Sequence, residues 1–369
     1  MFVLDSHCDT PSQIFRLRDM TLDNDHSHVD FPKLRRGGID GAFWALYVPA
    51  DMSSEAGEEY AYKMLGSVMS VLESNPDKAA LTLSPEQALA NKAAGLFSVF
   101  LALENGSPIG GSLDKLHDFY DAGIRYMTLS HSANNLICDS CASDVRKWNG
   151  LSPFGREVVE HMNRLGMMID VSHISDESFY DVLECSRAPV VASHSCCRAL
   201  AGHPRNMTDD MIRALAAAGG VIQINFFPVF LDGGFGKILD GSGIGEHGEA
   251  IEQEFIACPS DTGRRAAWYG VLDELDALER PSYKRIADHI DHVVSLVGID
   301  HVGLGSDFDG IAVTPRGMED ASCFPVIFDE LRRRGYSEPD VEKIAGANFL
   351  RVFSEVRRLS GSSCSGSVR

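Results

Sequence analysis

The chain has 369 residues, of which 44% are hydrophobic and 23% are charged, and its formal net charge is −20. This composition is typical of a soluble globular protein, and the acidic balance argues against binding to nucleic acid or to an anionic membrane, which both need a basic face. No apolar run approaches the ~20 residues of a membrane span, and the start MFVLDSHCDT lacks the features of a secretory signal.

Segments with strand character alternate with segments of helical character along nearly the whole chain. The predicted strands are Phe2–Leu4, Gly41–Val48, Phe97–Leu103, Tyr126–Leu129, Met167–Val171, Ala188–Ala192, Val221–Phe227 and His301–Gly305. The predicted helices are Glu55–Glu73, Leu113–Ala122, Pro153–Leu165, Ser175–Cys185, Asp209–Ala218, Tyr283–Val297, Pro325–Arg334 and Pro339–Phe353. This alternation predicts an α/β fold, a (β/α)8 TIM-like barrel with additional C-terminal helices. A doubly wound open sheet is the alternative, but no Gly-rich phosphate turn follows the first strand.

We expect residues 1–357 to form a single domain. The stretch 230–262, after the seventh predicted strand, is rich in glycine and acidic residues and is long enough for a lid or an oligomer contact. The polar tail 358–369 is expected to be disordered. The nine cysteines are scattered, which suits reduced thiols and a cytoplasmic location better than a disulfide framework.

The stretch 166–195 reads as strand, helix and strand, with a histidine at the end of each strand. A right-handed crossover makes the two strands parallel neighbours, so that His173 and His194 project from the same end of one sheet. Two imidazoles placed in this way can share a metal ion.

Ionisable side chains follow most of the other predicted strands too. They are His7 and Asp9, Glu104, His131, His173, His194, and Asp307 with Asp309. Since chemistry in a (β/α)8 barrel sits at the carboxyl ends of the strands, their shared position predicts one site. The remaining histidines are better explained as structural, and Cys138 and Cys141 lack the second pair that a zinc ribbon requires.

Three of these imidazoles and two carboxylates form a plausible ligand set for metal ions: His7, Asp9, Glu104, His173 and His194. Nitrogen and oxygen donors without thiolate suit Zn²⁺, with Mn²⁺, Co²⁺ or Fe²⁺ as alternatives. Glu104 has two oxygens and can bridge two cations, which could hold a hydroxide nucleophile between them.

Three further residues would complete a hydrolytic site. Asp307 could accept the proton of the nucleophile and deliver it to the leaving amine, and His131 could donate to the oxyanion. Arg205 is a candidate for binding a substrate carboxylate, because its guanidinium makes bidentate contacts. A surface salt bridge is the alternative role for Arg205.

The sequence resembles the membrane (renal) dipeptidase family of zinc peptidases from about Asp5 to Phe353. The matching segments are DSHCDTP at Asp5–Pro11, ALENG at Ala102–Gly106, YMTLSHSANN at Tyr126–Asn135, GLSPFGREVVEHMNRLGMMIDVSH at Gly150–His173, SRAPVVASHS at Ser186–Ser195, RNMTDDM at Arg205–Met211, DHVGLGSDFDG at Asp300–Gly310 and ANFLRVF at Ala347–Phe353. Together these segments are highly specific.

The resemblance implies a binuclear zinc metallopeptidase of bacterial, cytoplasmic type that hydrolyses dipeptides, often with a D-residue at the C-terminal position. It implies that His7, Asp9 and Glu104 bind one Zn²⁺ while Glu104, His173 and His194 bind the other. It also implies that His131 and Arg205 contact substrate, that Asp307 moves the proton, and that the protein is a homodimer.

Two alternatives remain open. Another metal-dependent hydrolase, such as an N-acyl amino acid deacylase or a lactonase, commonly starts with HxH and uses a lysine-derived bridge, whereas this chain has His7-x-Asp9 and Glu104. A catalytically silent metal-binding barrel predicts that at least one ligand is replaced, yet every expected ligand is present.

Overall fold

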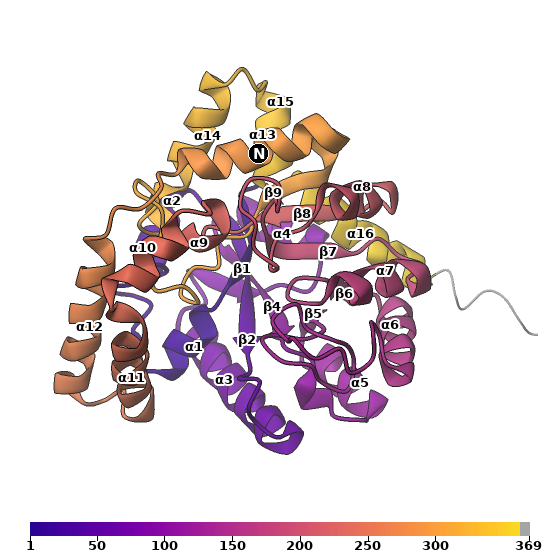
Figure 1. Cartoon of the computed structure of the whole chain (residues 1–369), viewed down its shortest axis with the longest axis horizontal. Helices are drawn as coiled ribbons and strands as arrows, with labels where there is room; N and C mark the ends of the chain where they lie inside the picture. The colour runs from indigo at the N-terminus through magenta and orange to yellow at the C-terminus, as the bar shows by residue number, and fades with distance from the viewer. Residues whose placement is uncertain (362–369) are drawn as a thin grey trace, which may run out of the picture.

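The computed structural model describes residues 1–361 and shows a ring of parallel strands surrounded by helices (Figure 1). The order of neighbouring strands is β1-β2-β4-β5-β6-β7-β8-β9, and every pair is parallel. The strands are β1 Leu4–Cys8, β2 Gly41–Tyr47, β3 Ala79–Leu81, β4 Phe97–Glu104, β5 Ile124–Thr128, β6 Met168–Asp170, β7 Val191–Ser195, β8 Val221–Ile224 and β9 Val302–Leu304. The predicted (β/α)8 barrel is therefore confirmed.

The helices cover the outside of this barrel. They are α1 Thr10–Phe15, α2 Phe31–Gly37, α3 Ser54–Ser74, α4 Pro85–Ala93, α5 Leu113–Asp121, α6 Pro153–Leu165, α7 Asp176–Cys185, α8 Asp209–Ala217, α9 Pro228–Leu231, α10 Phe235–Ser242, α11 Ile244–Ala257, α12 Thr262–Asp276, α13 Lys284–Val297, α14 Phe324–Arg333, α15 Glu338–Glu342 and α16 Asn348–Gly361. No helix within residues 1–361 is long and apolar enough to cross a membrane.

The barrel closes between the last strand and the first. Beyond β9 the backbone of Asp307 donates to His7 O at 3.0 Å, and Asp9 N donates to Phe308 O at 2.8 Å. A parallel bridge also joins Cys8 to Phe308. These bonds bring the segment after β9 against the end of β1, where the predicted site residues lie.

Two strands extend further along the chain than the sequence predicted. The predictions ended at Leu4 and Ala192, where the apolar runs end, but β1 continues to Cys8 and β7 to Ser195. The polar residues beyond Leu4 remain in the strand because they find buried partners: Ser6 Oγ donates to Ser193 O at 2.6 Å and to Leu304 O at 3.0 Å. His7 and His194 thus belong to strands rather than to the loops that follow them.

The sequence reading missed β3, a three-residue strand that pairs with the beginning of β4 outside the barrel order. Its alanine-rich sequence is too short to show a periodic pattern. At the other end of the chain, α16 extends to Gly361, so residues 358–361 are helical and not part of a disordered tail. Residues 362–369, for which we also predicted disorder, lie outside the described residues.

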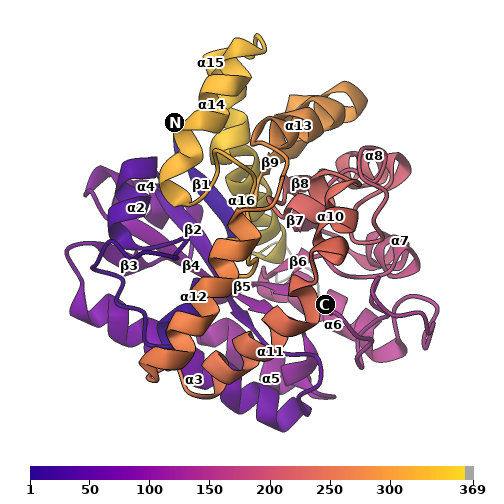
Figure 2. The same ribbon diagram turned by 60° about the vertical axis from the view of Figure 1, so that its left-hand side comes forward.

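The segment after β8 is mostly helical, in α9 to α12, and these helices extend beyond the predicted insertion 230–262. Helices α10, α11 and α12 lie together at one side of the barrel (Figures 1 and 2). Their buried residues Phe235, Ile244, Val271 and Leu275 form a separate hydrophobic cluster together with Val313. Apolar residues recur at helical spacing among the glycines and acidic residues of this segment, so each helix has an apolar face. The overall composition of the segment does not show this spacing.

The amino end of the barrel is filled by aromatic side chains. Phe349 and Phe353 of α16 pack against Phe43 of β2, with ring centroids 5.2 and 6.1 Å away, and Phe43 stacks on Phe100 of β4 at 4.6 Å. All four rings are buried. The additional C-terminal helix therefore seals the end of the barrel opposite the polar residues.

Replacing Phe353 with alanine should lower the free energy of unfolding by about 3–5 kcal/mol, because the truncation leaves a cavity in this aromatic layer. Urea denaturation measures the change. Leu89→Ala is the control, since Leu89 is 56% exposed and its truncation should cost no more than about 0.5 kcal/mol. Equal effects of the two substitutions would contradict a sealing role for α16.

Candidate metal centre

The five side chains predicted as metal ligands converge at the carboxyl end of the barrel. They come from β1 and the residue after it, from the last residue of β4, from the loop after β6 and from β7: His7, Asp9, Glu104, His173 and His194. Three groups of possible ligand atoms lie within 4.8 Å of one another: His7 with Glu104 and His194, Glu104 with His131 and His173, and His7 with Asp9 and Asp307. The parallel register of the strands produces this convergence.

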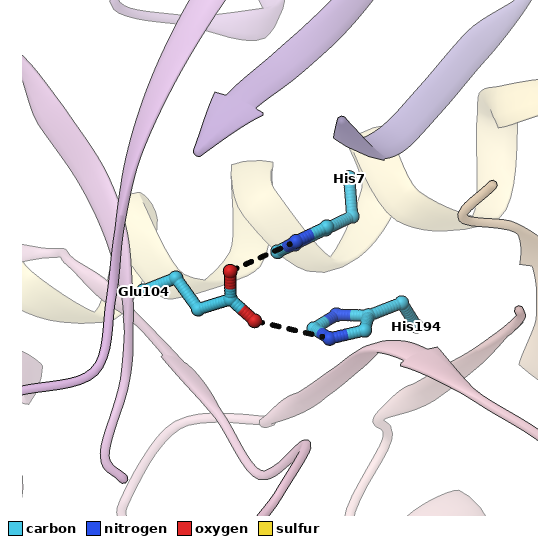
Figure 3. A group of neighbouring side chains, drawn as sticks. All are labelled: His7, Glu104 and His194. Carbon is cyan, nitrogen blue, oxygen red and sulfur yellow. Dashed lines mark ion pairs between the residues drawn. The ribbon is translucent and has the colours of Figure 1, made fainter. Parts of the chain in front are cut away.

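Glu104 lies at the centre, and its two oxygens face different imidazoles (Figure 3). Oε2 is 3.4 Å from His7 Nε2, whereas Oε1 is 3.4 Å from His194 Nε2 and 3.2 Å from His173 Nε2. The carboxylate is 4% exposed. This division of the two oxygens is the arrangement that a carboxylate shared by two cations requires.

Asp9 lies on the His7 side of the site, with Oδ2 3.5 Å from His7 Nε2. Neither His7 Nε2 nor Asp9 Oδ1 has a hydrogen-bond partner among the described residues, although both atoms are buried. Buried polar atoms without partners are rare in native proteins. A cation between these atoms would satisfy both, so the residues fit a metal ion.

Hydrogen bonds behind the site orient the His7 ring. Tyr126 donates its hydroxyl proton to Ser6 O at 3.0 Å, so its oxygen accepts from His7 Nδ1 at 2.7 Å. Because Nδ1 donates to Tyr126, Nε2 is the nitrogen of His7 that faces Glu104 and Asp9 and can bind a cation once its own proton has left. This is the usual way in which a second hydrogen bond fixes the tautomer of a metal-binding histidine.

A buried carboxylate does the same for His194. Asp170 accepts from Ser193 Oγ at 2.7 Å, and Ser193 Oγ in turn accepts from His194 Nδ1 at 2.7 Å. His194 Nε2 then faces His173 Nε2 at 2.9 Å. His173 itself has a left-handed backbone, with φ of 69°, a strained conformation of the kind that clusters at functional sites.

The protonation of these groups is set mainly by burial. Burial lowers the pKa of His173 and of His194 well below the usual value, so both are neutral ligands. Burial, together with the neighbouring Glu104, raises the pKa of Asp9 to about 7. Burial lowers the pKa of His7 too, but Tyr126 and Glu104 outweigh it, and the pKa ends well above the usual value. Protons therefore compete with cations for this half of the site.

Asp307 lies beside this half of the site, next to His7 and Asp9. Its Oδ2 accepts from Asn225 Nδ2 at 2.8 Å, and its backbone is left-handed, with φ of 64°. Burial, together with the charge of Asp9, raises the pKa of Asp307 to about 7. A carboxyl group with a pKa near neutrality can both accept and release a proton.

His131 borders the other half of the site. Its Nε2 is 3.9 Å from Glu104 Oε1, and its ring lies 4.2 Å from that of His173 and 4.8 Å from that of Tyr47. Burial lowers the pKa of His131 to about 3, so the imidazole is neutral. The side chain is 22% exposed, which leaves it accessible to a ligand.

Arg205 is buried beside the site, and its guanidinium donates only to uncharged acceptors. Nη1 donates to Ser195 Oγ and Nη2 to His194 O, each at 2.7 Å, while Nε has no partner. No carboxylate within residues 1–361 lies at ion-pair distance from Arg205, so the alternative of a surface salt bridge is wrong. The side chain of Phe230 lies 5.8 Å away. A buried cation without a counterion is suited to binding an anionic ligand.

Sequence reasoning missed the residues that support the site. Tyr47, Tyr126 and Asn225 all lie within predicted strands, where nothing in the sequence separates them from other strand residues. Asp170 carried the clearest signal, because it interrupts an otherwise apolar run. Cys138 is buried and Cys141 is half-buried, and both are free thiols outside this site.

Comparison with known proteins identifies relatives along the whole chain. The family model described as "Membrane dipeptidase (Peptidase family M19)" matches residues 1–365. Dipeptidase verJ of Clonostachys rogersoniana is 32% identical over 344 residues, which are 90% of this chain and 77% of that protein. Dipeptidase aclJ of Aspergillus oryzae is 32% identical over 363 residues, 95% of this chain and 75% of that protein.

Two solved structures have the same fold. The probable dipeptidase PvdM from Pseudomonas aeruginosa has a TM-score of 0.83 and 28% identity, covering 97% of this chain and 96% of that one. A metallo peptidase from Rhodobacter sphaeroides, liganded with a phosphinate mimic of the dipeptide L-Ala-D-Ala, has a TM-score of 0.79 and 25% identity, covering 96% and 99%.

Cation binding should weaken as the pH falls. Asp9 has a pKa of about 7, so at pH 6 a cation must displace its proton, whereas at pH 8 the carboxylate is already ionised. Zn²⁺ affinity of the metal-free protein should fall by at least roughly tenfold between pH 8 and pH 6. Calorimetric titration measures it. In Asp9→Asn the affinity should be low at both pH values, and equal affinities of the wild-type protein would contradict the proton competition.

Proposed function

Since this chain belongs to the membrane dipeptidase family, peptidase family M19, we propose that it is a metal-dependent dipeptidase. The observation that carries the proposal is the buried Glu104 carboxylate, which directs one oxygen towards His7 and the other towards His173 and His194. Names of the relatives and the dipeptide mimic on the Rhodobacter sphaeroides enzyme support the substrate class.

We propose two Zn²⁺ ions per chain. The first would be held by His7, Asp9 and Glu104, and the second by Glu104, His173 and His194. Nitrogen and oxygen donors without thiolate support this choice of metal. When bound, the two cations would polarise the scissile carbonyl and lower the pKa of water.

Asp307 is the proposed proton carrier. Its carboxyl group lies next to Asp9 and is oriented by Asn225 at 2.8 Å, and its pKa of about 7 allows it to accept a proton from water and then to release it. The released proton goes to the amine of the departing residue, which leaves as a neutral group.

His131 and Arg205 are the proposed substrate-binding residues. The neutral imidazole of His131 can donate an N–H to the carbonyl oxygen as negative charge develops on it. Arg205 supplies a buried positive charge for the free carboxylate at the C-terminus of a dipeptide. A free carboxylate lies next to only the last peptide bond of a chain, so Arg205 would direct hydrolysis to the C-terminal bond.

The Rhodobacter sphaeroides structure holds a phosphinate mimic of L-Ala-D-Ala, a dipeptide with a D-residue at its C-terminal position. We therefore propose that this enzyme accepts dipeptides of the L,D configuration as well as L,L dipeptides. An assay with L-Ala-D-Ala, L-Ala-L-Ala, an N-acyl amino acid and a lactone separates a dipeptidase from a deacylase and from a lactonase.

We also propose a cytoplasmic location and a homodimer. All eight cysteines within the described residues are free, as expected in a reducing compartment. The homodimer follows from the family resemblance, and light scattering on the purified protein tests it.

Replacing Glu104 with glutamine should reduce kcat/KM at least about 100-fold, because bound cations would contribute several kcal/mol of transition-state stabilisation and the amide would hold them poorly. Circular dichroism should show an unchanged fold. Glu184→Gln is the control, since Glu184 is 75% exposed and should leave activity unchanged. Wild-type turnover by the Glu104 variant would refute the shared-ligand role.

Replacing Arg205 with methionine should reduce kcat/KM for a dipeptide by roughly 100-fold, in line with the ~2–5 kcal/mol lost when one partner of a buried charge pair is removed. The C-terminally amidated dipeptide lacks the carboxylate, so its already slow hydrolysis should hardly change. Arg213→Met, at a side chain that is 51% exposed, is the control. An equal loss for both substrates would show that Arg205 does not bind the carboxylate.

A further inference from the structure

The turn that carries Asp307 is strained and tightly packed. Asp307 and Asp309 both have left-handed backbones, with φ of 64° and 69°. Residues other than glycine rarely adopt this backbone conformation. Gly310 follows, and a Cβ at this position would lie 2.1 Å from Asp9 Oδ2 and 2.7 Å from Asp307 Oδ1. Other contacts must hold a turn with these conformations in place.

The side chain of Asp309 makes those contacts, and it points away from the predicted metal ligands. Its Oδ2 accepts from Arg18 Nη1 at 2.6 Å and from Thr10 Oγ1 at 2.8 Å, while Oδ1 accepts from the backbone N of His28 at 3.2 Å. The backbone N of Asp309 donates to His28 Nδ1 at 2.9 Å. Arg18 and His28 both belong to the segment between α1 and α2.

The pair formed by Asp309 and Arg18 is nearly closed to solvent, with side chains 1% and 12% exposed. Burial alone would raise the pKa of Asp309, but Arg18 and His28 hold it below its usual value, so the carboxyl group is ionised. Arg18 Nη1 also donates to Val29 O at 3.2 Å. Removing one partner of such a buried ion pair leaves the other charge without compensation, and this destabilises the surrounding structure.

We infer that Arg18 is a positioning residue, which acts through its ion pair with Asp309 to hold the Asp307 carboxyl group in its catalytic position. The inference rests on the proposed role of Asp307 as proton carrier. Arg18 itself contacts none of the predicted metal ligands or substrate-binding residues. Its effect on catalysis must therefore pass through the turn.

The position of Arg18 allows it to be replaced without opening the core of the barrel. Its side chain lines a surface hollow of about 250 Å³ between α12 and the segment before α2, together with His28, Tyr269 and Asp309. Arg18→Met keeps most of the apolar length of the side chain and removes the charge. Arg36→Met is the matched control, because Arg36 lies in α2 and forms an exposed ion pair with Asp23 at 2.7 Å.

The test is a double-mutant cycle between Arg18→Met and Asp307→Asn, with steady-state kinetics on a dipeptide that the wild-type enzyme hydrolyses. Arg18→Met alone should lower kcat by roughly 10–100-fold, since small displacements of a catalytic group have effects of this size. KM and Zn²⁺ content should remain unchanged. In the Asp307→Asn background, Arg18→Met should change kcat by less than about twofold, because the group that it positions has already been removed.

An equal loss of kcat in both backgrounds would overturn the inference, and so would wild-type kcat in Arg18→Met. Arg18→Lys keeps a positive charge and should therefore have a higher kcat than Arg18→Met. If Arg18→Met does not fold, Arg18→Lys takes its place in the double-mutant cycle. Arg36→Met should behave as wild type.

A crystal structure of the Arg18 variant separates this inference from the proposed function. The Asp307 carboxyl group should move away from Asn225 in the variant, and an unmoved turn would overturn the inference whatever the activity. Failure of the wild-type protein to hydrolyse any dipeptide would instead refute the proposed function, and the structural comparison would still test the role of Arg18.

Discussion

The buried carboxylate of Glu104 is the constraint around which the carboxyl end of this barrel is built. A buried charge is costly unless opposite charges or hydrogen bonds compensate for it, and the nearest groups are the imidazoles of His7, His173 and His194. Two of these imidazoles are held neutral by burial. Cations shared with Glu104 would supply the missing charge, so the site and its metal ions stabilise each other.

The two ends of the barrel are organised by different interactions. Buried aromatic rings from β2, β4 and α16 seal the amino end by apolar packing. At the carboxyl end, polar side chains replace them, and hydrogen bonds to Tyr126, to Asn225 and, through Ser193, to Asp170 orient them. This division places stability and chemistry at opposite ends of the same strands, as is usual in barrels of this kind.

The sequence predicted the barrel and the convergence of His7, Asp9, Glu104, His173 and His194, because alternating strands and helices place strand ends together. It did not predict where β1 and β7 end, since their last residues are polar and remain in the strands through partners on other strands. Asp170 and Asn225 were missed for the same reason: their importance depends on which neighbours the register brings beside them. The helices after β8 were hidden by a composition rich in glycine.

The most direct test of the shared-carboxylate arrangement is a crystal structure of the protein loaded with Zn²⁺, with anomalous diffraction recorded at the zinc edge. Two peaks about 3.5–4 Å apart, one on each side of Glu104 and each within bonding distance of a different oxygen, are the predicted result. A single peak, or two peaks of which only one contacts Glu104, would contradict the account.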